Sequence, residues 1–117
     1  NAGHLTPLLR KKSGNVIPIG KEESGLPLGI LGDTVYQEVT IQIAPGDMMI
    51  SFTDGITEAM DDGKRIYGRQ RLENLLTGPF DGIDAAIQGI VEDVEKFVPD
   101  GQSRDDICLV GFGRLAT

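Results

Sequence analysis

The most informative pattern in the chain is an alternation of apolar and polar residues that ends at a glycine. Met48, Ile50 and Phe52 share one parity, which predicts a strand with one face on a hydrophobic core. Asp54 follows at the same parity, and Gly55 interrupts the strand directly after it. A carboxylate is therefore expected at the rim of the core, where an unpaired charge is costly and a cation is a favourable partner.

A second apolar run, residues 107–112, begins just after Asp105. It is apolar at both parities, which predicts a strand covered on both faces. If this strand and strand 48–53 are antiparallel neighbours, the end of one lies beside the start of the other. Asp54 and Asp105 then meet at one edge of the sheet, and grouped carboxylate oxygens suit Mg²⁺ or Mn²⁺.

Two hairpins are expected in the first half of the chain. Residues 5–9 and 16–19 flank a basic, glycine-containing turn, so they predict a hairpin with the run Arg10-Lys11-Lys12 at an exposed tip. Residues 34–43 alternate as a half-buried strand, and the turn at residues 44–47 would pair them with the strand that leads to Asp54.

The segments between and after these strands give the remaining expectations. Residues 20–32 are glycine-rich and predict an ordered loop whose apolar residues pack against the sheet. A turn at Asp61-Asp62-Gly63-Lys64 precedes a short helix from Arg69 to Leu76. The strongest helical pattern runs from Ile83 to Val98, with Asp81 at its capping position. Antiparallel strands with two helices indicate an α+β domain.

Composition narrows the class of protein. The chain has 117 residues, which suits one domain, and its net charge of −7 argues against a nucleic-acid partner. The single cysteine, Cys108, has no disulfide partner and is expected to be a small buried hydrophobe. No apolar stretch approaches the roughly 20 residues of a membrane span, so a cytoplasmic location is the default expectation.

Five segments, taken together and in order, resemble the C-terminal half of the PPM metal-dependent protein phosphatases. The branch that they resemble is the bacterial stage II sporulation protein E family, whose members act on sigma-factor regulators. The matching segments span nearly the whole chain and are residues 1–9, 26–29, 52–59, 68–72 and 105–110.

The resemblance implies an antiparallel β-sandwich flanked by helices, with two Mg²⁺ or Mn²⁺ ions at one end. Asp54 and Asp105 match metal-binding residues of the family, and Asp106 matches a position with a secondary ligand or orienting role. Gly55 allows the sharp backbone turn beside the metal, and His4 matches a position near the catalytic edge, where it could donate a proton or contact phosphate. A packed, structural His4 is an equally good reading.

The implied reaction is hydrolysis of phosphoserine or phosphothreonine on a protein by metal-activated water, with a phosphorylated anti-sigma-factor antagonist as the usual substrate. Residues 1–117 would then be the C-terminal part of one phosphatase domain, a fragment of a longer chain that is inactive alone. The open edge of a half-sandwich would also favour dimerisation.

Several alternatives remain open at this stage. Asp54 could simply cap the backbone of an Asp-Gly turn. The chain could be a non-catalytic docking module with a phosphatase fold, which would predict the loss of a metal ligand elsewhere in the full-length protein. A structural Ca²⁺ domain is less consistent with the sequence, because no EF-hand spacing is present.

Overall fold

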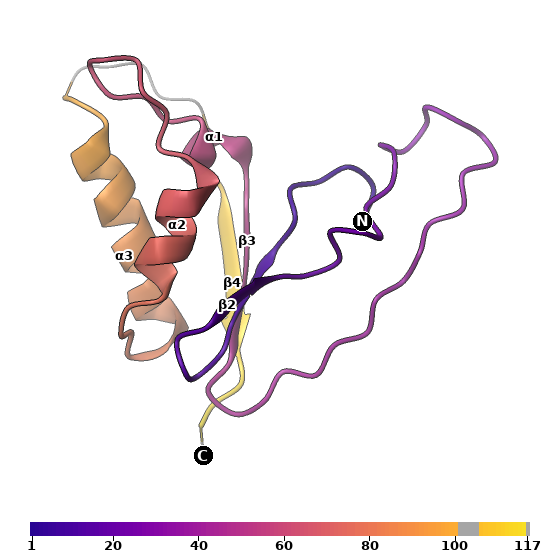
Figure 1. The fold of residues 1–117 in the computed structure, drawn as a ribbon, viewed down its shortest axis with the longest axis horizontal. Helices are drawn as coiled ribbons and strands as arrows, with labels where there is room; N and C mark the ends of the chain where they lie inside the picture. Colours follow the sequence, from indigo (N-terminus) through magenta and orange to yellow (C-terminus); the bar gives the residue numbers. More distant parts are fainter. Residues whose placement is uncertain (101–105, 117) are drawn as a thin grey trace.

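The computed structural model describes residues 1–100 and 106–116, and these residues form one antiparallel sheet with helices against it (Figure 1). The strand order is β2-β1-β3-β4, and each neighbouring pair is antiparallel. The α+β class and the antiparallel sheet flanked by helices are thus confirmed. The elements are β1 (Leu8–Arg10), β2 (Val16–Pro18), β3 (Met48–Phe52), α1 (Asp54–Thr57), α2 (Arg69–Leu76), α3 (Gly82–Phe97) and β4 (Leu109–Gly113).

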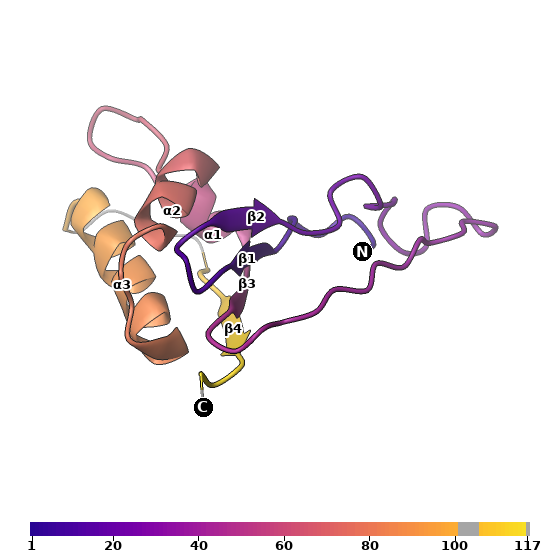
Figure 2. The same cartoon turned by 60° about the horizontal axis from the view of Figure 1, so that its bottom comes forward.

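Helices α2 and α3 cover one face of the sheet, while the long segment between β2 and β3 extends to the other side (Figures 1 and 2). The alternation in β3 is confirmed, because its inward side chains join the core with the apolar faces of the two helices. Helix α3 approaches β4 closely at Gly111, where a Cβ atom would lie 2.7 Å from the Ile83 side chain. The core residues shared by these elements include Met48, Ile50, Phe52, Leu72, Leu76, Ala86, Ile90 and Val94.

The sequence predicted helices α2 and α3 well. Helix α2 has the expected bounds, and α3 is displaced by one residue at each end from the expected range of 83–98. Asp81 does occupy the N-cap position of α3, but its side chain makes no capping hydrogen bond. The turn at residues 61–64 is also confirmed, and an ion pair between Asp61 and Arg65 closes it at 2.7 Å.

The first hairpin is confirmed, but Arg10 does not lie at an exposed tip. Strands β1 and β2 pair as expected, with β2 at the edge of the sheet. Arg10 shares the inward parity of Leu8 and is only 6% exposed. Its Nε donates to the Leu76 carbonyl oxygen at 2.7 Å and its Nη2 to the Gly78 carbonyl oxygen at 2.6 Å. The Arg10 guanidinium therefore satisfies backbone carbonyl groups at the C-terminal end of α2 that have no partner within the helix.

The expected strand over residues 34–43 is wrong. The structure shows no strand there, and Val35 is 90% exposed. The physical reason is that both edges of β3 are already paired, one with β1 and the other with β4, so no position for a hairpin partner is left. The apolar residues of segment 20–32 do not pack against the sheet either, since Leu28 is 77% exposed.

The expectation that both faces of the last strand are covered is also wrong. The helices cover only the face that carries Leu109 and Gly111, and on the opposite face Val110 is 57% and Phe112 is 54% exposed. Cys108, just before β4, is exposed rather than buried. An apolar strand in the sequence therefore indicated two apolar faces, but only one of them is covered by the described residues.

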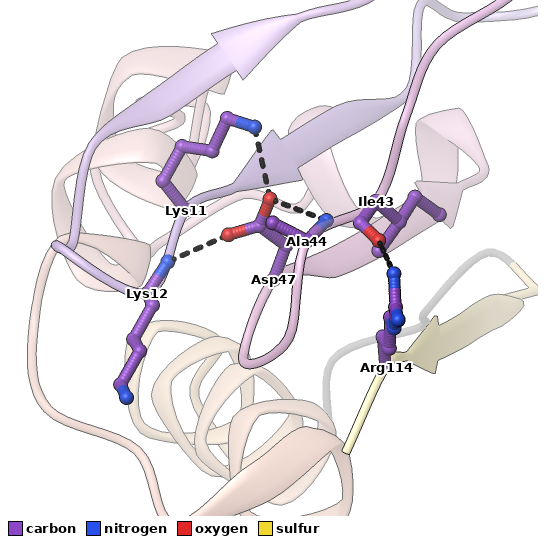
Figure 3. Close-up of polar contacts among 6 residues, drawn as sticks. All are labelled: Lys11, Lys12, Ile43, Ala44, Asp47 and Arg114. Atoms are coloured by element: carbon purple, nitrogen blue, oxygen red, sulfur yellow. Dashed lines mark hydrogen bonds and ion pairs between the residues drawn. The ribbon is translucent and has the colours of Figure 1, made fainter. Parts of the chain in front are cut away.

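A buried carboxylate organises the end of the sheet at which β3 begins (Figure 3). Asp47 is 2% exposed, and its Oδ2 accepts a hydrogen bond from Lys11 Nζ at 2.9 Å. The backbone N–H of Lys12 donates to Oδ1 at 3.0 Å, and that of Ala44 donates to Oδ2 at 3.1 Å. On the other side, the Arg114 N–H donates to the Asp47 carbonyl oxygen at 3.1 Å. One residue thus connects the first hairpin, β3 and the end of β4.

Replacing Asp47 with asparagine is expected to lower the free energy of unfolding by about 2 kcal/mol at pH 7, because the Lys11 ammonium loses its charged partner in a largely buried site. The hydrogen bond from Lys11 holds the pKa of the Asp47 carboxyl below its usual range. Its stabilising effect is therefore present above pH of about 4 and is lost as pH falls through the lowered folded-state pKa. Urea unfolding should show the difference from wild type shrinking below pH of about 4.

Candidate metal centre

The end of β3 and the start of β4 are held together around Thr53. Its backbone N–H donates to the Cys108 carbonyl oxygen at 3.1 Å, and the Cys108 N–H donates to Thr53 Oγ1 at 3.0 Å. The ladder beside them places Phe52 opposite Leu109. The two strands are thus antiparallel neighbours, which meets the condition set in the sequence analysis, and residues that follow β3 lie beside residues that precede β4.

Gly55 packs directly against the backbone of Asp106. A Cβ atom on residue 55 would overlap the Asp106 carbonyl oxygen, and the Ile107 side chain lies 3.5 Å from the same point. Gly55 is buried within α1 and is not one of the glycines with a left-handed backbone. The absence of a side chain is therefore what this position requires, so that the Asp54 corner and Asp106 can approach each other.

Asp54 begins α1 and presents its side chain to solvent. Its carbonyl oxygen accepts the Glu58 N–H at 2.8 Å, which fixes the backbone of the short helix. Among the described residues, no hydrogen bond or ion pair engages the Asp54 carboxylate. Asp106 is exposed as well, whereas Asp105 lies outside the described residues. The Asp106 backbone lies against Gly55, so Asp54 and Asp106 belong to the same edge of the sheet.

This pair of carboxylates fits a hard divalent cation in donor type. Mg²⁺ and Mn²⁺ prefer oxygen ligands, and Mg²⁺ in proteins is commonly held by one or two carboxylates with water filling the other positions. Within residues 1–100 and 106–116, no group of three or more His, Cys, Asp or Glu side chains is arranged to hold a metal ion. The assignment of Asp54, Asp105 and Asp106 to a metal site therefore stays a prediction.

A known protein family matches the part of the chain that contains Asp54, Gly55 and Asp106. The family model described as stage II sporulation protein E (SpoIIE) matches residues 1–114. The chain belongs to the SpoIIE family. The match includes Asp54, Gly55 and Asp106 together, so the carboxylate edge lies within the SpoIIE homology region.

Two solved structures resemble the SpoIIE-family fold described here. The PP2C phosphatase domain of SpoIIE from Bacillus subtilis, solved with a fragment of its regulatory domain, matches with a TM-score of 0.70 and 26% identity. The match covers 95% of this chain and 32% of that one. The structure of the RsbU and RsbW domains of Rv1364c from Mycobacterium tuberculosis matches in fold, with a TM-score of 0.65 and 21% identity over 99% of this chain and 31% of that one.

A relative of known sequence also matches nearly the whole chain. The chain is 28% identical to Protein IcfG from Synechocystis sp. over 114 residues, which cover 97% of this chain and 18% of IcfG. The chain thus spans less than a fifth of IcfG and about a third of each structure. No helix among the described residues of this SpoIIE-family chain is long and apolar enough to cross a membrane.

Among the described residues, the hydrogen bonds of His4 are made with Asn1 and Leu5, not with residues of the carboxylate edge. The ring is exposed, and its Nδ1 lies 2.9 Å from the Leu5 carbonyl oxygen, which only accepts, so Nδ1 carries the proton in this contact. His4 and Ser51 line a cavity of about 350 Å³ whose lining does not include Asp54. The assignment of His4 as a site residue stays a prediction.

Sequence reasoning missed a cluster around the buried Tyr67, which packs just after the Asp54 corner. The backbone N–H of Tyr67 donates to the Ala59 carbonyl oxygen at 2.7 Å, just after α1. The Tyr67 hydroxyl donates to Asp93 Oδ2 on α3 at 2.6 Å, and Arg71 Nε donates to the same oxygen at 3.0 Å. Burial and the hydrogen bond to Asp93 raise the pKa of the Tyr67 hydroxyl. Arg71 and Asp93 thus form an ion pair between α2 and α3.

Replacing Tyr67 with phenylalanine is expected to lower the free energy of unfolding by about 1 to 2 kcal/mol, because a hydrogen bond to a charged acceptor is lost while the ring packing remains. Thermal unfolding of the variant measures this. Tyr36→Phe is a matched control, since the Tyr36 hydroxyl donates to the Leu26 carbonyl oxygen in an exposed loop. An equal loss in both variants would contradict a special role for the Tyr67–Asp93 pair.

Proposed function

We propose that the full-length protein is a Mg²⁺- or Mn²⁺-dependent protein phosphatase that hydrolyses phosphoserine or phosphothreonine, and that this chain supplies one side of its active site. The substrate we propose is a phosphorylated anti-sigma-factor antagonist, as the resemblance in the sequence implies. Membership of the SpoIIE family and the structural likeness to a PP2C phosphatase domain support the phosphatase class.

One observation in the structure carries the proposal. Gly55 and Asp106 are in backbone contact, so Asp54 at the end of β3 and Asp106 before β4 lie at a single edge. If Asp54 were only a turn residue, there would be no reason for residue 55 to lack a side chain. A site that needs Asp54 and Asp106 at one place gives that reason, because a side chain at residue 55 would push the two strand ends apart.

The chain's own residues would act by holding and orienting. Asp54 and Asp105 would each bind a divalent cation, and Asp106 would orient the neighbouring groups or act as a secondary ligand. When bound, the two cations supply Lewis acidity that lowers the pKa of water and offsets phosphoryl charge. The hydrogen bonds at Thr53 and the backbone contact at Gly55 keep the two strand ends from separating, which preserves the spacing of the carboxylates.

The exposed apolar residues of β4 support the further proposal that residues 1–117 are the C-terminal part of a larger phosphatase domain. A row of apolar residues crosses all four strands on the face opposite the helices, and its members at the β4 end are exposed. The row follows the strand register and consists of Ile17, Leu9, Met49 and Phe112, with Val110 beside it. Apolar patches of this kind on a single domain usually mark a buried contact.

The test is hydrolysis of a phosphoserine peptide by the full-length protein, with Mn²⁺, with Mg²⁺ and after removal of metal by EDTA. We expect activity that requires metal and returns when Mn²⁺ is added back. Residues 1–117 alone are expected to bind metal weakly and to hydrolyse the peptide at no useful rate. A full-length protein that folds, binds Mn²⁺ and remains inactive would instead favour a docking module with a phosphatase fold.

A further inference from the structure

A large groove lies at the end of the sheet opposite to the carboxylate edge. Its volume is about 820 Å³, and it is bounded by the start of β3 at Met48, the first turn of α3 and the segment that follows β4. Asp54 lies beyond the other end of β3, so the groove is separated from the candidate metal centre by the whole length of that strand. Nothing in the proposed phosphatase chemistry uses it.

The groove combines apolar and charged lining residues, and two parts of its wall are held by contacts with other elements. Phe80 packs against α3, where a Cβ atom on Gly89 would lie 2.8 Å from its ring. The Arg10 guanidinium lies 5.7 Å from the centre of the same ring while it donates to the carbonyl oxygens at the end of α2. The hydrogen bonds of Asp47 hold the opposite wall. These two parts of the wall are therefore preformed, which lowers the ordering cost of binding there.

The mouth of the groove is positively charged. Lys12 and Arg114 lie on either side of the turn that carries Asp47, and both are exposed and line the groove (Figure 3). Arg10 adds a buried positive charge to the wall, against one acidic lining residue, Asp81. This is unusual for a chain with eleven basic and eighteen acidic residues and a net charge of −7. Local charge thus has the opposite sign to that of the whole chain.

We propose that this groove is a docking site for an acidic, apolar segment of a partner protein. Apolar side chains of the segment would pack on Phe80, Ile83 and Leu115, and its carboxylates would lie near Lys12 and Arg114. The charge pattern decides between occupants, because a basic segment would meet repulsion at the mouth and a lipid tail would leave the cations unused. The site is independent of the phosphatase chemistry, so either proposal can fail without the other.

The test uses the full-length protein and three fluorescein-labelled synthetic peptides, read by fluorescence anisotropy. The first alternates aspartate or glutamate with leucine or phenylalanine, the second has lysine in place of the acidic residues, and the third has serine in place of the apolar ones. We expect the first to bind at least about tenfold more tightly than either of the others, with an affinity that falls between 50 mM and 500 mM NaCl because surface charges are screened.

Variants then locate the site. The pair Lys12→Glu with Arg114→Glu is expected to weaken binding of the first peptide at least about tenfold, and Leu115→Ser by about threefold. The matched control is Lys21→Glu with Lys96→Glu, which changes the net charge equally at exposed residues outside the groove. Asp54→Asn should leave binding unchanged. Thermal unfolding of each variant verifies that it is folded.

Three results would overturn the proposal. Equal binding of all three peptides would show non-specific adsorption. An equal loss in the control pair would show that only net charge matters. A dimer, seen by light scattering, that dissociates when Lys12 and Arg114 are reversed would show that the groove is occupied by a second copy of the chain instead.

Discussion

Replacing Asp54 with asparagine is expected to lower kcat/KM for phosphopeptide hydrolysis by the full-length protein at least about a hundredfold. Removing a group that only orients a metal ligand lowers metal affinity or activity about 10- to 100-fold. Loss of a ligand itself should therefore lower activity by at least the upper end of that range. Asparagine keeps the size and shape of the side chain but removes its charge. We expect the Mn²⁺ concentration needed for half-maximal activity to rise as well, and Asp105→Asn to behave in the same way.

Stability separates this effect from unfolding. The Asp54 carboxylate is exposed and engages no other described side chain, so its replacement should change the melting temperature little. Asp33→Asn makes the same chemical change at an exposed loop carboxylate and should leave both activity and metal dependence intact. If Asp54→Asn kept full activity at low Mn²⁺, the residue would be a turn residue and the metal site would have to lie elsewhere.

The elements that the sequence predicted are those whose partners are close in the chain or strongly patterned. Helix α2, helix α3 and the first hairpin follow from local periodicity and turn residues, and the structure contains all three. The antiparallel pairing of β3 with β4 could be anticipated only through chemistry, because two carboxylates at strand ends gave a reason for those strands to be neighbours.

The segment 34–43 shows where periodicity alone is insufficient. Its alternation is as regular as that of β3, but a strand also needs a free edge with which to pair. The edges of β3 are occupied by strands from distant parts of the chain, β1 and β4, and this competition cannot be seen in a local window. Alternation therefore predicted the potential to form a strand but not its partner.

Arg10 and Asp47 show a second limit. Each reads as a polar residue of a turn, yet each is buried with several partners contributed by other elements. A signal for Arg10 was present, since it shares the parity of Leu8 and therefore the face of the core. No comparable signal existed for Asp47, because its partners, Lys11 and the N–H of Lys12, are brought to it only by the pairing of β1 with β3.

Replacing Gly55 with alanine is expected to be the most damaging small substitution near the carboxylate edge. The added methyl group would overlap the Asp106 carbonyl oxygen, which is backbone and cannot rotate away like a side chain. Overpacking of this kind costs about 3 kcal/mol, so the melting temperature should fall clearly. To relieve the overlap, the start of β4 must move away from α1, and that movement separates Asp106 and its neighbours from Asp54.

The loss of stability and the loss of the site can be told apart. At a temperature where the Gly55→Ala protein is folded, we expect its rate of phosphopeptide hydrolysis at limiting Mn²⁺ to be at least about a hundredfold below that of wild type. High Mn²⁺ should restore part of the rate, because a changed spacing lowers the affinity for Mn²⁺ while the ligands themselves are still present. Gly63→Ala is the matched control, since a Cβ there would meet only ordinary contacts of 3.4 Å and beyond. It should be neutral or slightly stabilising. Wild-type metal dependence in a folded Gly55→Ala protein would mean that the contact between Gly55 and Asp106 serves packing alone and does not set the spacing of the metal ligands.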